Sequence, residues 1–141
     1  MTGQQVTPER WLTVADRMLS GSGGLGAAAV AGGWWPRACA CLIRLALEAG
    51  IEAYWQRVNP AVVACTRGRT RLLLLRARNG PGLAVARRAA YAWATLSQAT
   101  HHRGYETVPA ATELRHLHTE VTSLLDTLQR CGVGLSSPYR R

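Results

Sequence analysis

The most regular stretch of the sequence is WPRACACLIRLALEAGIEAYWQR, which runs from Trp35 to Arg57. Small and apolar side chains recur in it at steps of three and four residues, as an amphipathic helix requires: Ala38, Leu42, Leu45, Ala49 and Ala53. Pro36 suits the first turn of such a helix, where a backbone N–H has no partner in any case. The stretch therefore predicts one long helix with an apolar face.

Helix signals also lie on both sides of this stretch. Thr7 is a capping residue followed by Pro8, so a helix begins there. Its apolar face is predicted to consist of Trp11, Val14, Ala15 and Met18. Asn59 and Pro60 end the long helix and start a third element that reaches about residue 78. We expect this element to be helical, because no second strand signal exists to pair with its apolar run 72–75.

Two more helices are predicted towards the C-terminus. The first covers residues 83 to about 101 and is rich in alanine, which allows a neighbouring helix to approach closely. The second covers about 110–131, and its apolar stripe consists of Leu114, Leu117, Val121, Leu124, Leu125 and Leu128. His118 falls within that stripe and is interpreted as a half-buried packing residue. Together these elements predict an all-α protein, an antiparallel bundle of four to five helices.

Composition limits the class of protein. With 141 residues and 48% hydrophobic side chains, the chain is predicted to form a single domain over 1–141, with 132–141 as a flexible tail. Its four cysteines have no CxxC spacing and are interpreted as reduced, mostly buried thiols. No signal peptide or membrane span is apparent, so we expect a protein of the cytoplasm that does not enter a membrane.

Charge is distributed unevenly along the chain. All seventeen basic residues are arginine, and the net charge is +9. No acidic residue occurs between Glu52 and Glu106, whereas nine arginines do. Such a segment attracts RNA or another polyanion, or an acidic protein partner, although it can also be only a solvated surface. The arginines expected to contact nucleic acid are Arg67, Arg69, Arg71, Arg87 and Arg88.

A polar cluster follows the alanine-rich helix, from Ser97 to Glu106. Its His101, His102 and Arg103 are the candidate catalytic residues, because imidazoles exchange protons near neutral pH and a guanidinium holds a phosphate. These are the groups that RNA cleavage without a metal needs, and they also suit plain phosphate binding or a helix cap. The histidines lack the spacing of a metal site, so we expect neither a metal nor another cofactor.

The chain resembles the HEPN-like helical domains of bacteria. The resemblance rests on the segments 34–38 and 46–48, on Tyr54 and Trp55, and on the His-Arg-x-Tyr-Glu pattern at 102–106. It implies a helical bundle, a homodimer and, for many members, ribonuclease activity in toxin, defence or stress systems. The Leu-Glu pair that the family carries on its long helix makes Glu48 a further, weaker catalytic candidate. Arg44 lies four residues before Glu48 and flanks it on the helix.

The family signature places an arginine before a histidine on one helix with four to six residues between them, and this chain departs from it. No arginine occurs at positions 94–97, which precede His101 and His102 at that spacing. Either the histidines work with Arg103 in a changed geometry, or the domain has lost catalysis and retains binding. The missing arginine favours the loss of catalysis. The alternative function is a non-catalytic helical module that docks an acidic protein partner.

Overall fold

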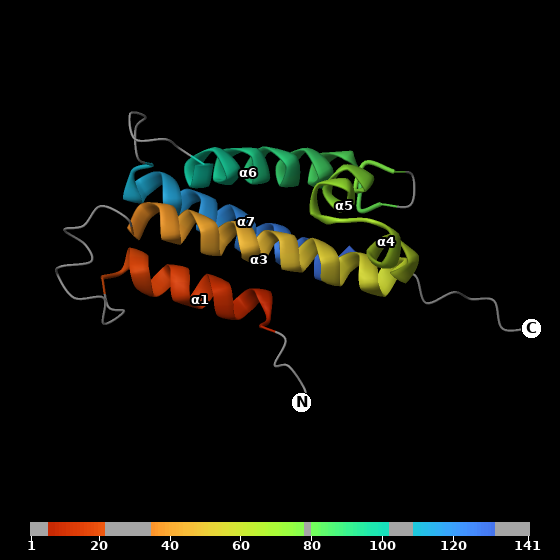
Figure 1. Ribbon diagram of the computed structural model, residues 1–141, viewed down its shortest axis with the longest axis horizontal. Coiled ribbons are helices and arrows are strands. Elements are labelled where there is room, and N and C mark those ends of the chain that lie inside the picture. The colour runs from red at the N-terminus through yellow and green to blue at the C-terminus, as the bar shows by residue number, and fades with distance from the viewer. Residues whose placement is uncertain (1–5, 22–34, 78–79, 102–108, 132–141) are drawn as a thin grey trace, which may run out of the picture.

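The computed structural model describes residues 6–21, 35–77, 80–101 and 109–131. Within these ranges it contains helices and no strand (Figure 1), which confirms the predicted all-α fold. The helices are α1 (Pro8–Leu19), α3 (Trp35–Val58), α4 (Pro60–Cys65), α5 (Gly68–Leu74), α6 (Leu83–His101) and α7 (Ala111–Cys131). The predicted tail at 132–141 and the second half of the polar cluster, 102–106, lie outside the described residues.

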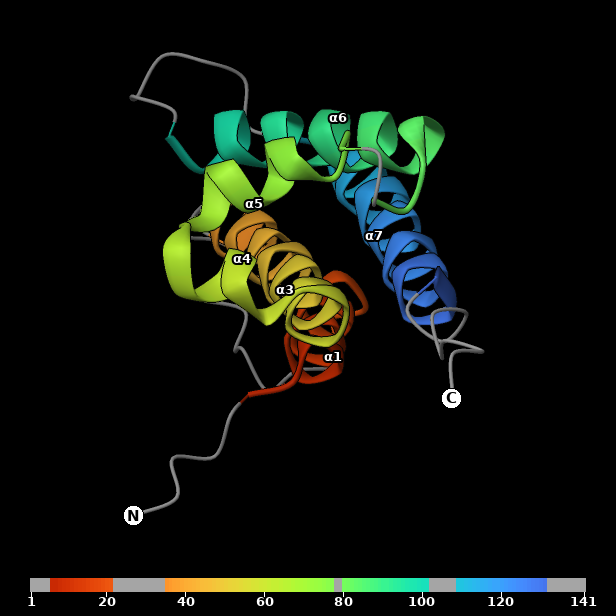
Figure 2. The ribbon, with the colours of Figure 1, turned by 90° about the vertical axis from the view of Figure 1, so that its right-hand side faces the viewer.

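Helix α3 is the centre of the bundle and packs against each of the other five described helices. α1 and α6 run in the opposite direction to α3 and α7, as the colours of Figure 1 show. Figure 2 shows α1 below α3 and α7 beside it, while α6 crosses obliquely above them. The short helices α4 and α5 cover the end of the bundle at which α3 ends and α6 begins. The four long helices thus form an up-and-down bundle.

Helix α1 begins where the sequence predicts, with Thr7 in an extended conformation at the N-cap and Pro8 in the first turn. The predicted apolar face is partly wrong. Leu12 and Ala15 are the buried residues, whereas the Val14 side chain is 42% exposed. α1 rests on α3 and α7 only along one narrow side, so an apolar residue just off that line stays in solvent.

The bounds of α3 agree with the predicted helix, but its predicted apolar face is displaced. All five predicted residues, Ala38, Leu42, Leu45, Ala49 and Ala53, are only partly buried. The fully buried positions include Cys39, Ile43, Ala46, Leu47 and Ile51. A helix that neighbours contact from several sides has apolar residues around much of its circumference, so the period of the sequence does not define one face.

The predicted third element is two short helices and not one. Thr66 and Arg67 adopt extended backbone conformations between α4 and α5, which interrupts the helical hydrogen bonds. The Trp55 indole of α3 donates a hydrogen bond of 2.9 Å to the backbone carbonyl of Arg71. This bond ties α5 to the end of α3. Leu72 and Leu75 are buried against the core, so the choice of helix over strand for this apolar run is confirmed.

The two C-terminal helices match their predictions closely. In α6 the buried residues are four alanines and Leu96, so small side chains face the core as expected. In α7 all six residues of the predicted stripe are buried. Gly50 of α3 is packed against Leu125 of α7: a Cβ added at Gly50 would overlap Leu125 Cδ2 and lie 3.2 Å from its Cγ. The absence of a side chain at Gly50 therefore sets how closely α3 and α7 approach.

The prediction of mostly buried thiols is wrong. Cys39 is buried, Cys41 and Cys131 are partly buried and Cys65 is exposed, and all four are free cysteines. Cys65 is the last residue of the short helix α4, which contributes no buried residue to the core, so its side chain has nothing to pack under. None of the helices in the described part of the chain is both long and apolar enough to cross a membrane.

Candidate functional site

Arg44 links two elements that lie far apart in the sequence. Its Nη1 donates a hydrogen bond of 3.0 Å to Thr100 Oγ1 and lies 3.4 Å from His101 Nε2, so the middle of α3 is tied to the last turn of α6. The Thr100 hydroxyl donates its own proton to the Ser97 carbonyl at 2.9 Å, which leaves its lone pairs for the guanidinium. The Arg44 side chain is only 20% exposed. It is held in place rather than extended into solvent.

Glu48 belongs to the same group of side chains. Its Oε1 lies 3.6 Å from Arg44 Nε one turn earlier on α3, and it accepts a hydrogen bond of 3.1 Å from the Trp93 indole of α6. The carboxylate is therefore fixed from both helices. Arg44 Nε is buried, and this donor of the guanidinium makes no hydrogen bond. We call Arg44, Glu48, Trp93, Thr100 and His101 the arginine–histidine cluster.

A guanidinium has only donors, so Nε2 of the His101 ring can only be the acceptor in its contact with Arg44. His101 is exposed. An exposed imidazole beside a fixed guanidinium is placed to exchange a proton with a ligand while the arginine binds the negative charge of that ligand. The cluster is chemically suited to a phosphate diester.

The sequence named two members of this cluster, Glu48 and His101, and missed the residue that joins them. Arg44 was noted only as a neighbour of Glu48 along the helix. The remaining two catalytic candidates, His102 and Arg103, lie outside the described residues. Arg44 carries no local signal of its role, because its partner His101 is 57 residues away in the chain. A charged residue on a flank of the central helix is the one available hint.

The five arginines expected to bind nucleic acid fall into two groups. Arg67, Arg69 and Arg87 are exposed. Arg71 already has partners, since its Nη1 lies 3.2 Å from a Glu52 carboxylate oxygen and its Nη2 donates to the Val63 carbonyl. Arg88 has partners as well: Nε donates to Glu120 at 2.7 Å and Nη2 donates to Ser123. Only the exposed group is available for a ligand without breaking an existing bond.

The exposed arginines of this set, Arg67, Arg69 and Arg87, lie on or beside helices that contain no acidic residue. Neither α4, α5 nor α6 contains an aspartate or glutamate. Arg76, just after α5, is exposed as well. The described acidic residues belong instead to α1, α3 and α7. The surface of α5 and α6 with Arg67, Arg69, Arg76 and Arg87 is called the basic face.

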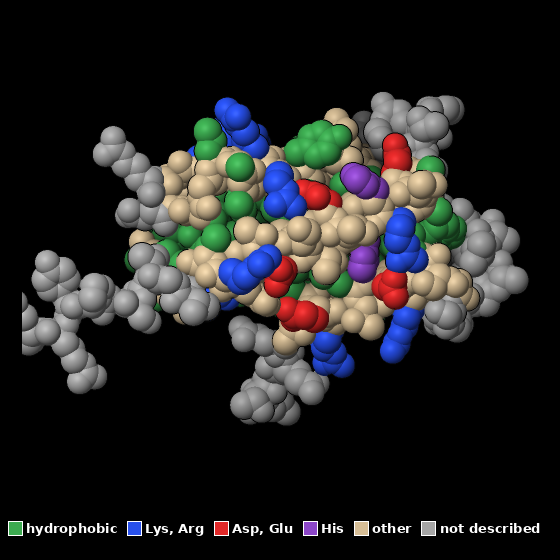
Figure 3. All heavy atoms as spheres, turned by 180° about the vertical axis from the view of Figure 1, so that it is seen from behind, with side chains coloured by type: hydrophobic (Ala, Val, Ile, Leu, Met, Phe, Trp, Pro, Cys, Tyr) green, Lys and Arg blue, Asp and Glu red, His purple; other side chains and the backbone are tan. Residues whose placement is uncertain are grey.

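On the side of the molecule seen in Figure 3, acidic and basic side chains lie next to one another, and no single sign dominates. The ion pairs made by α7 explain the mixture: Arg115 pairs with Asp16 of α1, Arg130 with Asp126, and Glu120 with Arg88. Charges that neutralise one another in this way leave little net field for a polyanion.

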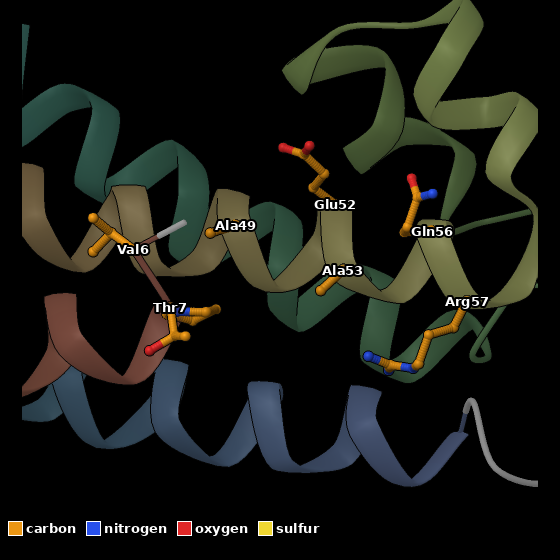
Figure 4. A pocket seen from close by; sticks show the side chains of 8 residues that line it. Val6, Thr7, Ala49, Glu52, Ala53, Gln56 and Arg57 are labelled. Carbon is orange, nitrogen blue, oxygen red and sulfur yellow. The ribbon is translucent and has the colours of Figure 1, made fainter. Parts of the chain in front are cut away.

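A groove of about 520 Å³ lies elsewhere, between the start of α1 and the second half of α3 (Figure 4). It is lined by Val6, Thr7, Pro8, Ala49, Glu52, Ala53, Gln56 and Arg57. Its two charged groups are already engaged, because Glu52 pairs with Arg71 and Arg57 donates to the Leu128 carbonyl at 3.1 Å. The polar side chains that remain in the lining, Thr7 and Gln56, are both exposed, and neither carries a charge with which to bind an ionic ligand.

With the cluster, the basic face and the groove described, the chain can be set against known proteins. Comparison with protein-family models, curated proteins and solved structures finds no match. The case for function therefore rests on this chain's own residues. Among the described residues, no group of three or more histidine, cysteine or acidic side chains is placed to hold a metal ion.

Proposed function

We propose that this protein is an RNA-binding helical domain whose basic face contacts the phosphate backbone, in the manner of a HEPN-like domain. The observation that carries the proposal is the segregation of charge: α4, α5 and α6 have no acidic residue, and the arginines exposed on and beside them are Arg67, Arg69, Arg76 and Arg87. The chain has a net charge of +9, and on these helices no acidic residue of the same helix opposes the positive field. Phosphates bound there release condensed counterions, which makes binding favourable and salt-dependent.

The experiment measures affinity for a short fluorescent RNA at several salt concentrations. Arg69→Glu and Arg87→Glu are compared with the matched control Arg10→Glu, which makes the same charge change on α1, at the opposite side of the bundle (Figure 1). We expect each reversal on the basic face to weaken binding and to reduce the salt slope by about 0.7 for a lost single-strand phosphate contact. Arg10→Glu should leave the slope nearly unchanged.

Equal losses in all three variants would mean that only net charge matters and would contradict a defined face. If RNA does not bind at all while an acidic protein copurifies with the chain, the function is that of a protein-docking module. The resemblance to HEPN-like domains also implies a homodimer. Light scattering with and without RNA measures that state directly.

A second candidate function, RNA cleavage, is favoured by the contact between Arg44 and His101. A bound phosphate that draws the guanidinium away from Nε2 would free the imidazole lone pair to accept the proton of the adjacent 2′-hydroxyl. The 2′-oxygen would then form a bond to phosphorus while the bond from phosphorus to the 5′-oxygen breaks, and the 5′-oxygen would leave as a hydroxyl after taking a proton from water. Arg44 would neutralise charge on the phosphate oxygens during this step. This supplies an arginine and a histidine from different helices, in place of the family pattern on one helix.

Cleavage is tested with a labelled oligouridylate and the variants His101→Ala and Arg44→Lys, each purified in the same way as the wild type. If this site cleaves RNA, the products should end in a cyclic phosphate. Cleavage should be lost in His101→Ala. It should be strongly reduced in Arg44→Lys, because lysine cannot hold His101 and a phosphate with separate planar donors. Equal cleavage by all three proteins would indicate a contaminating nuclease. No cleavage by the wild type leaves RNA binding as the function.

A further inference from the structure

The outward side of α6 carries an aromatic ring that the core does not use. Tyr91 is 72% exposed, more than the other exposed large hydrophobic residues in the described part of the chain. The buried residues of α6 lie on the opposite side of the helix. In Figures 1 and 2, α6 lies at the edge of the bundle, with the other labelled helices on one side of it. A large side chain in that position is available for a ligand.

Polar residues continue the line through Tyr91 along α6. Arg87 lies one turn before it and Gln98 two turns after it, and both are exposed. The spacings of four and seven residues place all three side chains on one side of the helix. His101 follows three residues after Gln98, so the line leads to the arginine–histidine cluster about 15 Å along the axis from Tyr91.

The character of this line favours a nucleic acid over a second protein. A helix that docks on another protein presents a row of apolar anchors. Leu83 is exposed as well, but it is the first residue of α6, and from Arg87 to Gln98 the line carries one aromatic ring between a cation and an amide. A second copy of the chain is disfavoured as the occupant, because α6 contains no acidic residue to meet the arginines of its twin. An unpaired base, by contrast, stacks on an exposed ring while its phosphate meets a neighbouring cation.

We propose that the outward face of α6 binds a single RNA strand, with one base stacked on the Tyr91 ring and an adjacent phosphate on Arg87. The inference rests on the proposed RNA-binding function and adds to it that the strand is unpaired and that bases, not phosphates alone, are recognised. In a duplex the bases are stacked on one another and present no face to the ring. The preference for single strands is therefore a direct consequence.

The test compares a short fluorescent oligouridylate with an abasic strand that has the same number of phosphates. The wild type should bind the oligouridylate roughly tenfold more tightly, since stacking of a base on an aromatic ring contributes a factor of this order. Tyr91→Leu, which keeps an apolar side chain without a ring face, should remove the preference. Tyr91→Phe, which keeps the ring, should retain it. Thermal unfolding of both variants checks that the fold is intact.

Three outcomes would overturn the inference, and they are distinct. Equal affinity of the wild type for both strands, or a Tyr91→Leu variant with the full preference, would refute stacking while binding through the arginines stands. Tighter binding of duplex than of single-stranded RNA would refute the unpaired strand. Binding of neither strand would refute the proposed function itself.

Discussion

The Arg115 guanidinium, near the start of α7, donates a hydrogen bond of 2.5 Å to the Asp16 carboxylate in the last turn of α1. This bond, and to a smaller degree the nearby charges of Arg115 and His118, hold the pKa of Asp16 below its usual value. A lowered pKa means that the folded state binds fewer protons than the unfolded chain. The pair therefore stabilises the fold above the ordinary aspartate pKa of about 4, and this contribution is lost as pH falls through the lowered value.

The first prediction concerns this pH dependence. Asp16→Asn should lower the urea midpoint of unfolding near pH 7 and should have a smaller effect at about pH 3, below the ordinary aspartate pKa, where the contribution of the ion pair has begun to be lost. Asp126→Asn is the matched control, because its carboxylate pairs with Arg130 within one helix and both side chains are well exposed. An Asp16→Asn effect of the same size at both pH values would contradict the role of the ion pair.

The close approach of α3 and α7 leads to the second prediction. Gly50→Ala should destabilise the protein by about 1 kcal/mol, because forcing Leu125 aside costs about 1–3 kcal/mol and the better helix propensity of alanine returns about 1 kcal/mol. Gly68→Ala is the control, since a Cβ there meets no atom within 4 Å. The measurement is chemical denaturation of both variants. A Gly50→Ala protein more stable than the wild type would show that Leu125 repacks freely.

Thiol reactivity provides a third prediction. Burial raises the pKa of Cys39 to about 11, so little thiolate forms at neutral pH, and its side chain lies under α1 with the Ala15 carbonyl 3.8 Å away. Iodoacetamide should therefore modify exposed Cys65 first and Cys39 last, as followed by mass spectrometry of the digested protein. In Cys65→Ser the fast phase should disappear. Modification of Cys39 at the rate of Cys65 would indicate that α1 detaches from the bundle.

The fourth prediction separates two adjacent arginines. Arg88→Gln should destabilise the fold by about 0.5 kcal/mol through loss of the partly exposed pair with Glu120, whereas Arg87→Gln should change stability little. The opposite order is expected for RNA affinity. Arg87→Gln should weaken binding more than Arg88→Gln, because Arg87 is exposed while Arg88 already has partners. A double-mutant cycle with Glu120→Gln measures the coupling. If Arg88→Gln weakens RNA binding more than Arg87→Gln, the assignment of the two residues is wrong.

Sequence patterns predicted the bounds of α6 and α7 nearly to the residue, and α7 has a continuous polar side that defines its apolar stripe. The same reasoning misplaced the buried face of α3. Its Ala38 and Leu42 lie at the flanks, where neighbouring helices cover them only in part. Amphipathic periodicity identifies the inner face of a peripheral helix, whereas a central helix has no single outer face to contrast with it.

The candidate site was predictable only in part, for a related reason. Glu48 and His101 were selected by residue type and by family resemblance, and both contact Arg44 in the structure. The contact itself depends on how α6 crosses α3, which no local pattern encodes. Likewise, the sequence marked Arg71 and Arg88 as available cations because their acidic partners, Glu52 and Glu120, come from other helices.

The confinement of the described acidic residues to α1, α3 and α7 has a further consequence under the proposed function. Arg67, Arg69, Arg76 and Arg87 are exposed on and beside α5 and α6, so positive charge is concentrated there, and the field of an approaching RNA would turn the molecule towards that side. Encounters are then biased towards the side that carries Tyr91 and Arg87. Diffusion would deliver a strand to α6 already oriented, with an association rate that falls steeply as ionic strength rises.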